Sequence, residues 1–406
     1  MRRVLEAFVF RGFGFLLLFL MHLSIGRILG PDGYGIFNFG FMVASLLVIF
    51  ASLGWPTAIV RLFAEYGASK EWGLLIGASK RSIHTVLFVS LCFSLLLTLI
   101  ARHSFFNTEQ QIGLQFAALL IPVLALIGLI RKGFIAFERT NTSIVLEDIL
   151  IPALFIVLLF ALNLSGVVEI TIAYLTTAIV ALLVSLFVFR SVFRKQIPRA
   201  PAEYKTKYWT GLGAAMVLGG IGQIVINRLD VMMLGVMVEM DSVGIYVASN
   251  RLALVATMPL IAVHTVVASK MAKAYYGNDL DEFRQLLYRS ATWSALGALP
   301  IVIALVLSPG LFLNLFGSGY ESGISLLRIL TVAQFVNALT GSANFALLVT
   351  GRERQYAAMT GLIAALNVVG NLIAIPIAGA LGAAIVSAVC VVILNLWLMR
   401  IALAIK

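Results

Sequence analysis

Long apolar runs, each bounded by charged or turn residues, recur along the whole chain and constrain its fold more than any other feature. About 20 consecutive apolar residues cross a bilayer as one helix. Runs of that length lie near residues 8–28, 35–60, 82–101, 112–135, 147–165, 170–190, 209–236, 242–267, 291–308, 324–349, 356–377 and 380–403. We therefore predict an all-α, polytopic membrane protein with about 12 transmembrane helices and no sizeable soluble domain.

The composition agrees with a chain that lies mostly in lipid. Of the 406 residues, 61% are hydrophobic and 12% are charged, whereas soluble domains carry about 25% charged residues. The formal net charge of +11 would suit nucleic acid, but Lys and Arg lie in short segments beside the apolar runs, so no nucleic-acid partner is expected. No set of His, Cys or carboxylate residues has metal-ligand spacing, so no metal site is expected.

The distribution of basic residues predicts the orientation. Counted on alternate sides of the predicted helices, the 29 Lys and Arg residues fall on one side, except for Arg11, Arg27, Arg102, Arg228, Arg251 and Arg328. Basic residues gather on the cytoplasmic side of membrane proteins. We therefore expect both termini in the cytoplasm and a multi-pass protein of the cell (inner or plasma) membrane.

A basic segment at the middle of the chain divides it into two similar halves. Residues 190–209, RSVFRKQIPRAPAEYKTKYW, carry two prolines, which predicts a cytoplasmic linker (191–208) between six-helix lobes at 1–190 and 209–406. When the halves are aligned about 209 residues apart, Gly26 falls on Gly235 and Gly35 on Gly244. Six helices per repeat is an even number, so we expect lobes related by an axis along the membrane normal, with a substrate site between them.

The stretch GRILGPDGYGIFNF, residues 26–39, places glycines and a proline between two apolar runs. A phosphate-binding loop would follow a strand and carry the GxxxxGK[ST] spacing, and neither is present. The stretch therefore predicts a turn between two membrane helices. Glycine would supply a positive φ, Pro31 would end the first helix, and the second would begin at Tyr34 or Gly35.

The segments ILGPDGYGIFNF, SLGWPTAIVRLFAEYG, NRLDVMMLG and SVGIYVASNRLA resemble the polysaccharide or lipid-linked oligosaccharide flippases, which include O-antigen translocase-like proteins. These form a branch of the multidrug, oligosaccharidyl-lipid and polysaccharide (MOP) exporter superfamily. The resemblance covers nearly the whole chain. It implies two six-helix lobes around a central cavity and transfer of an undecaprenyl-pyrophosphate-linked glycan from the cytoplasmic to the outer leaflet. Many members have fourteen transmembrane helices, whereas this sequence predicts twelve.

Charged residues deep within apolar runs are the best site candidates, because they are costly in lipid and usually face a cavity or a partner. Arg251 follows Asn250 and lies roughly 12 Å into the eighth predicted helix at 1.5 Å per residue. A guanidinium at this depth suits a diphosphate, which accepts two parallel hydrogen bonds from it. The alternative is a buried structural pair with a neighbouring helix. The equivalent positions of the first half are Phe41 and Met42, so this site would be asymmetric.

Asn227, Arg228 and Asp230 cluster in the seventh predicted helix. In the functional interpretation Arg228 contacts the glycan phosphate, and Asp230 binds a sugar hydroxyl or a coupling cation. In the other interpretation the charges lie at the outer membrane interface, where long side chains reach water. Arg228 and Asp230 are two residues apart and face different sides of a helix, so they need not pair.

Four further residues are weaker candidates. Arg11 and His22 are eleven residues apart and so share one face of the first predicted helix, where they would line the cavity. Otherwise Arg11 reaches the lipid headgroups and His22 is a core histidine. Arg61 and Lys270 end their helices on the cytoplasmic side, either as membrane anchors or at the cavity mouth, where they would capture the headgroup.

These observations predict a flippase, not an enzyme, that works by alternating access. The expected partners are a lipid-linked glycan, membrane lipids and polysaccharide polymerase or assembly proteins. No cofactor is expected, and a proton or sodium gradient is the candidate energy source. A cation or drug exporter of the same superfamily is one alternative. A membrane-embedded glycan polymerase or glycosyltransferase is another. Asp279-Leu280-Asp281 matches the DxD pattern of glycosyltransferases, but it precedes a short predicted helix, where acidic residues favour the N-terminus, so we interpret it as a chance match.

Overall fold

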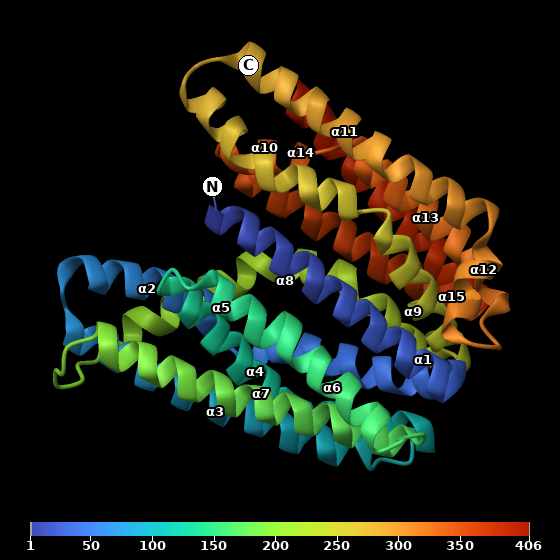
Figure 1. Cartoon of the computed structure of the whole chain (residues 1–406), viewed down its shortest axis with the longest axis horizontal. Helices are drawn as coiled ribbons and strands as arrows, with labels where there is room; N and C mark the ends of the chain where they lie inside the picture. Colours follow the sequence, from blue (N-terminus) through green and yellow to red (C-terminus); the bar gives the residue numbers. More distant parts are fainter. Residues whose placement is uncertain (1, 406) are drawn as a thin grey trace. The chain divides into compact units, whose positions relative to one another are not determined.

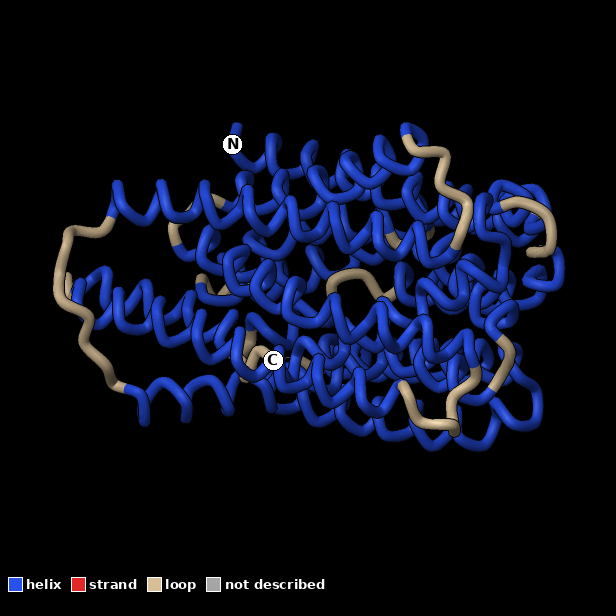
Figure 2. Tube along the Cα trace, turned by 90° about the horizontal axis from the view of Figure 1, so that it is seen from below, coloured by secondary structure: helices blue, strands red, loops and turns tan. Residues whose placement is uncertain are grey.

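The protein is all-helical in the part of the chain that the structure describes. The computed structural model describes residues 2–405, and the side chains of residues 2–9, 215, 217–227 and 265 lie outside that description. Every regular element within these limits is a helix (Figure 2). The chain forms two compact units: Met1–Leu29 with Ile36–Gly220, and Gly30–Gly35 with Ile221–Lys406. Residues 191–208, the predicted linker, therefore belong to the first unit.

Long antiparallel helices build the first unit. Helix α4 packs against both α3 and α7, and α6 packs against α7 (Figure 1). Asn107 and Gln110 begin α4 with a reciprocal capping box, in which each side chain accepts a hydrogen bond from the other residue's backbone N–H. The elements are α1 (Arg2–Ala51), α2 (Trp55–Ser69), α3 (Trp72–Ala101), α4 (Thr108–Ala136), α5 (Thr140–Ile144), the π-helical turn η1 (Val145–Ile149), α6 (Leu150–Ala161) and α7 (Val167–Gln196).

The second unit is also built from helices that pack against one another. Buried residues that include Met271, Phe283 and Leu287 form a core where α10, α11, α14 and α15 meet. The elements are α8 (Thr206–Met237), α9 (Met240–Val255), α10 (Met258–Tyr276), α11 (Leu280–Leu307), α12 (Pro309–Leu313), η2 (Asn314–Phe316), η3 (Glu321–Gly323), α13 (Ile324–Leu339), α14 (Ala343–Val349) and α15 (Glu353–Leu403).

The helices fit the predicted membrane topology. In the described part, 8 helices are long and apolar enough to cross a membrane, or 9 if the bent pair α9–α10 counts as one span. Helices α1 and α15 are each kinked at a glycine with positive φ, Gly30 and Gly379, so each passes through two of the predicted spans. Helix α8 covers the seventh predicted span. The architecture is therefore consistent with the predicted count of about 12.

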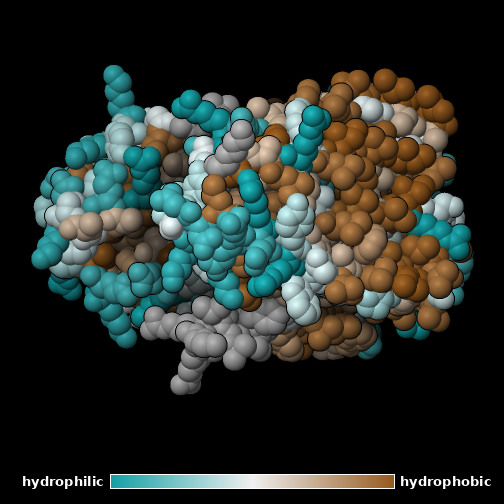
Figure 3. All heavy atoms as spheres, turned by 90° about the horizontal axis from the view of Figure 1, so that it is seen from above, coloured by the Kyte–Doolittle hydropathy of each residue, from teal (hydrophilic) through white to brown (hydrophobic). Residues whose placement is uncertain are grey.

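The outer surface suits lipid. Large side chains such as Phe187 (77% exposed) and Ile377 (80% exposed) face outward, and hydrophobic atoms form a continuous area on part of the face in Figure 3. An apolar surface of this kind is unfavourable in water and stable in a bilayer. The chain is a multi-pass membrane protein.

The turn in GRILGPDGYG is shorter than the sequence predicts. Gly30 takes φ 67° and ψ −177°, and helical geometry resumes at once. The prediction that the second helix begins at Tyr34 or Gly35 is wrong, because Pro31 begins the helix instead of delaying it. The fixed φ of proline suits the first helical position, where its missing N–H breaks no hydrogen bond.

Two of the predicted spans are broken just before a proline, and a third, 324–349, is divided between α13 and α14. The span predicted at 35–60 ends its first helix at Ala51 and resumes at Trp55. The span predicted at 242–267 consists of α9 and α10, whose axes differ by 47°. In both cases a proline follows the break, Pro56 in α2 and Pro259 in α10. Interrupted helices of this kind mark binding sites in many transporters.

The repeat-equivalent glycines Gly35 and Gly244 meet in the second unit. A Cβ added to Gly35 would lie 1.8 Å from the carbonyl oxygen of Met240. One added to Gly244 would lie 1.9 Å from the carbonyl oxygen of Pro31. Only glycine fits at these two positions, because backbone atoms occupy the space that the Cβ of any other residue would need. Segment 30–35 and α9 therefore cross at backbone contact distance.

The basic segment before α8 is docked on the first unit. The backbone N–H of Glu203 donates to Gly73 O at 2.9 Å. Trp209 is fully buried, and its Nε1 donates to Tyr66 Oη at 2.9 Å. The ring of Trp209 also meets that of Trp55 edge to face at 6.3 Å. The segment that leads into α8 is thus held against the first unit at Glu203 and Trp209, while most residues of the predicted linker 191–208 are exposed.

Replacing Tyr66 by phenylalanine is expected to lower the thermal stability of the purified protein. The change removes the acceptor of the Trp209 N–H and leaves a buried donor unpaired, which costs about 1–3 kcal/mol. Tyr208→Phe is the control, because the Tyr208 hydroxyl lies at the exposed surface, where it donates to Glu65 Oε2 at 3.1 Å. Differential scanning fluorimetry in detergent should give a lower Tm for Tyr66→Phe and an unchanged Tm for Tyr208→Phe. Equal Tm values for the two variants would contradict this account.

Candidate functional site

Asp230 is the centre of a buried polar network in the second unit. It is 8% exposed. Its Oδ2 accepts hydrogen bonds from Tyr246 Oη at 2.9 Å and from Ser387 Oγ, and its Oδ1 accepts one from Asn371 Nδ2 at 2.8 Å. Asn371 also donates to Asn367 Oδ1 at 3.1 Å. Helices α8, α9 and both halves of α15 contribute residues to this network.

The Asp230 network is incomplete in two ways. Among the residues that the structure describes, no Lys, Arg or His pairs with Asp230, so only neutral donors balance its charge. Asn371 Oδ1 is buried and has no hydrogen-bond partner within the described part of the chain. A buried carboxylate is stable when a proton or a cation neutralises it. Carboxylate, amide and hydroxyl oxygens are also the ligand types that hard cations prefer.

Arg251 lies near the end of α9, about one turn before the break that separates α9 from α10. Its side chain is partly buried, and its Nε is buried without a hydrogen-bond partner among the side chains that the structure describes. Asn250 beside it is also partly buried. The structure thus places an Arg donor with unused hydrogen-bonding capacity at an interruption of a membrane span.

The other predicted residues of the seventh span have different surroundings. Arg228 is partly buried on α8. Arg228 takes no part in the hydrogen bonds of Asp230. This agrees with the prediction that two residues two positions apart face different sides of a helix. The side chain of Asn227 lies outside the described residues.

The predicted residues of the first unit do not form one cluster. Arg11 is exposed and lines a pocket of the first unit. His22 is 2% exposed and meets Phe37 edge to face at 6.2 Å, an environment typical of a core histidine. Arg61 is exposed on α2, and Lys270 is exposed on α10 of the second unit.

The DxD pattern has a structural explanation. The carboxylate of Asp279 caps α11 by accepting a hydrogen bond from the backbone N–H of Glu282 at 2.9 Å. Asp281 follows in the first turn, where acidic residues favour the helix dipole. In the described part of the chain, no three His, Cys, Asp or Glu side chains come together as candidate metal ligands.

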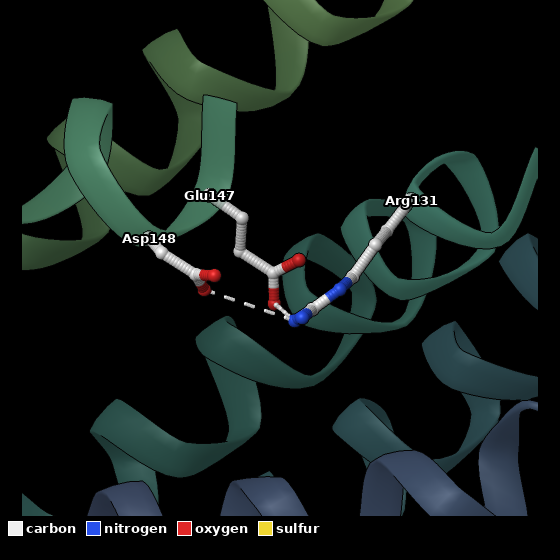
Figure 4. Close-up of polar contacts among 3 residues, drawn as sticks. All are labelled: Arg131, Glu147 and Asp148. Atoms are coloured by element: carbon white, nitrogen blue, oxygen red, sulfur yellow. Dashed lines mark ion pairs between the residues drawn. The ribbon is translucent and has the colours of Figure 1, made fainter. Parts of the chain in front are cut away.

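An ion-pair cluster in the first unit was not among the predicted sites. Arg131 Nη1 lies 2.7 Å from Glu147 Oε1 and 3.9 Å from Asp148 Oδ1 (Figure 4). Both acids belong to the π-helical turn η1, which interrupts the fifth span between α5 and α6. Turns of this type occur frequently at functional sites. Two adjacent acids, Glu147 and Asp148, at the edge of an apolar run were a sequence signal for this site.

The helices, their kinks and the charges within them define a membrane protein with the fold of the MOP exporters. Over 98% of this chain and 86% of the other, the fold is similar to that of a lipid II flippase, MurJ, in an inward closed conformation (TM-score 0.75, 14% identity). It is about equally similar to an inward-facing MATE family multidrug resistance transporter (TM-score 0.74, 13% identity, 99% of this chain and 98% of that one). A MOP superfamily transporter from Pyrococcus furiosus also matches, over 99% of this chain and 95% of that one (TM-score 0.60, 17% identity).

The chain belongs to the polysaccharide biosynthesis protein family, whose model matches residues 4–269. This match and the shared fold confirm the resemblance that the sequence motifs indicate. No curated protein matches the sequence.

Proposed function

We propose that the protein is a flippase that moves a polyprenyl-pyrophosphate-linked oligosaccharide from the inner to the outer leaflet by alternating access. Membership of a polysaccharide biosynthesis family supports a glycan-related cargo. The shared fold supports transport rather than enzymatic chemistry. The similar fold of the lipid II flippase MurJ supports a lipid-linked cargo for this chain.

The observation that carries the proposal is the environment of Arg251. A guanidinium within a membrane span is costly unless it meets an anion or lines a polar cavity. Arg251 lies at a helix break, and its Nε has no partner among the described residues. A diphosphate headgroup would supply the missing acceptors through charge-assisted hydrogen bonds. Arg228, partly buried on α8 of the same unit, is a second candidate for this contact.

Asp230 supplies the candidate site for energy coupling. Binding of a proton or a sodium ion would neutralise the buried carboxylate, and Asn371 Oδ1 is positioned in the network without another partner. Because the network joins α8, α9 and both halves of α15, loading and unloading of the ion would change how these helices pack. Such a site biases an equilibrium between two conformations when the ion favours one of them.

A cation exporter is the alternative, since the MATE transporter is about as similar in fold as the flippase. An exporter of organic cations requires unbalanced carboxylates in its binding cavity. Here Glu147 and Asp148 face Arg131, and Asp230 is enclosed by its own network. Apart from Asp230, the candidate charges within the spans of the second unit are Arg228 and Arg251, which favour an anionic headgroup.

The orientation follows from the positive-inside rule. We place both termini in the cytoplasm and the protein in the cell (inner or plasma) membrane. The headgroup would therefore enter on the side where Arg61 and Lys270 are exposed, and polysaccharide polymerase or assembly proteins would receive the glycan on the other side.

Replacing Arg251 by glutamine is expected to slow flipping by about tenfold or more, the effect of losing one strong charge-assisted hydrogen bond. The assay follows a fluorescent polyprenyl-pyrophosphate oligosaccharide in proteoliposomes, with a membrane-impermeant quencher that reports headgroup exposure. Arg354→Gln is the control, because Arg354 is exposed at the start of α15. It should flip the lipid at the wild-type rate.

Two outcomes would overturn the proposal. If the wild-type protein leaves the lipid in one leaflet, with proton and sodium gradients imposed, lipid flipping is not its function and cation efflux becomes the next assay. If wild type and Arg251→Gln flip equally fast, Arg251 does not bind the headgroup.

A further inference from the structure

A pocket of about 360 Å³ lies within the first unit. Helices α1, α4, α6 and α7 and the π-helical turn η1 all contribute to its lining. Ligand pockets usually range from about 300 to 1,000 Å³, so this pocket suits a group the size of one sugar ring rather than a whole oligosaccharide. None of the functional roles described so far uses it.

One side of the pocket is polar. Glu147 and Asp148 line it together with Arg11. Arg131 pairs with Glu147 from the neighbouring helix (Figure 4), and Arg11 lies close enough to Asp148 to stabilise its charge. The two acids are therefore offset by two guanidiniums. This wall offers many strong hydrogen-bonding groups and has no net charge.

One acceptor on this wall is unused. Glu147 Oε1 binds Arg131 at 2.7 Å, whereas Glu147 Oε2 is buried and has no hydrogen-bond partner among the described residues. A buried acceptor without a partner is uncommon in folded proteins. An ionised carboxylate accepts hydrogen bonds and cannot donate them, so the missing partner is a donor.

The pocket also has an aromatic side. Phe41 and Tyr174 line it, and their rings pack edge to face at 5.8 Å. Phe155 meets Tyr174 at the same centroid distance of 5.8 Å. These contacts hold the two rings in fixed orientations. A rigid aromatic surface in the same pocket as two carboxylates suits a ligand with one apolar face and several hydroxyl groups.

From this arrangement we infer that the pocket is a binding site for one sugar residue of the lipid-linked glycan. The hydroxyl groups of the sugar donate to Glu147 and Asp148, and its C–H face packs on Phe41 and Tyr174. Because the two guanidiniums balance the two carboxylates, the wall attracts neither a diphosphate nor an organic cation by net charge, whereas neutral hydroxyl groups still find acceptors on it. This inference rests on the proposed function and assigns the sugar to a site other than the one that binds the diphosphate.

The test compares lipids that differ in a single sugar. Native mass spectrometry of the purified full-length protein would measure binding of undecaprenyl pyrophosphate, and of the same lipid carrying one glucose, galactose or N-acetylglucosamine. At least one sugar-bearing lipid should bind wild type about tenfold more tightly than the bare lipid, which corresponds to one charged hydrogen bond. Glu147→Gln should abolish the affinity ratio between the sugar-bearing lipid and the bare lipid. It should leave the affinity for the bare lipid unchanged.

A second variant covers the case in which Glu147→Gln fails to fold. Leu18→Trp would fill the pocket, which Leu18 lines, without changing the ion pair, and it should also abolish the ratio. Glu71→Gln, at an exposed position of the same unit, should preserve it. Equal binding of all four lipids to wild type would overturn the sugar site and leave the flippase proposal standing. Failure of wild type to bind any of them would overturn both.

Discussion

Gly244→Ala is expected to lower the free energy of unfolding of the protein by about 3 kcal/mol, the upper end of the usual cost of overpacking. The new methyl group would lie 1.9 Å from Pro31 O and 3.0 Å from Gly35 N. Both are backbone atoms, which cannot turn away as a side chain can, so segment 30–35 and α9 would have to separate. At about 2–4 °C per kcal/mol for domains of this size, Tm should fall by about 6–12 °C.

Gly361→Ala is the matched control for this prediction. Gly361 also lies inside a helix of the second unit, and nothing lies within 4 Å of the Cβ that alanine would add. Alanine is favoured over glycine in helices by up to about 1 kcal/mol, so Tm should stay the same or rise. Differential scanning fluorimetry of both variants in one detergent is sufficient. A Gly244→Ala protein as stable as wild type would show that the close backbone contact is not required.

Asp230→Asn is expected to reduce gradient-driven flipping by about a hundredfold, the loss of about 2.7 kcal/mol of charge-assisted ion binding. Asparagine keeps the shape and one acceptor oxygen, but it neither takes up a proton nor carries the charge that attracts a cation. The change relieves the cost of burying a charge, but it also turns one acceptor oxygen of the network into a donor, which costs about 1–3 kcal/mol, so Tm should change little. Loss of transport without loss of stability is the signature of a coupling site.

The assay for Asp230→Asn imposes proton and sodium gradients separately on the same proteoliposomes. Asp281→Asn removes a charge from an exposed position of the same unit and should respond to the gradients as wild type does. The gradient that accelerates lipid flipping by the wild-type protein identifies the coupling ion, proton or sodium. If Asp230→Asn keeps the full wild-type response, the coupling site lies elsewhere. A wild-type protein that responds to neither gradient would contradict coupling at Asp230 altogether.

The membrane helices could be predicted because their signals are local. An apolar run of spanning length specifies a helix without reference to the rest of the chain. The residues that flank Gly30 likewise predict a turn from local sequence alone. The boundary at Pro31 was misplaced because proline both ends one helix and begins the next. The breaks at 52–54, 256–257 and 340–342 were missed because the apolar runs continue on both sides of them, although Gly54, Pro259 and Gly341 are local signals for an interruption.

The partners of the candidate residues could not be predicted in the same way. Asp230 was recognisable as a charge in a span, but Asn371 and Ser387 lie 141 and 157 residues further along the chain. One signal was present, since Asn367 and Asn371 are one helical turn apart in an apolar run and so share a face. The contact between Arg131 and Glu147 could not be predicted, because Glu147 lies in a π-helical turn and no residue pattern predicts such a turn.

Each half of the chain contributes a segment to the unit that the other half mainly builds. The N-terminal half contributes Gly30–Gly35 to the second unit, and the C-terminal half contributes the start of α8, up to Gly220, to the first. Trp209, fully buried, belongs to that exchanged part of α8. The arrangement is a reciprocal segment swap within one polypeptide, comparable to the exchange of arms in a swapped dimer. Two polypeptides cut at residue 200 would therefore form an obligate heterodimer, in which each chain completes the core of the other.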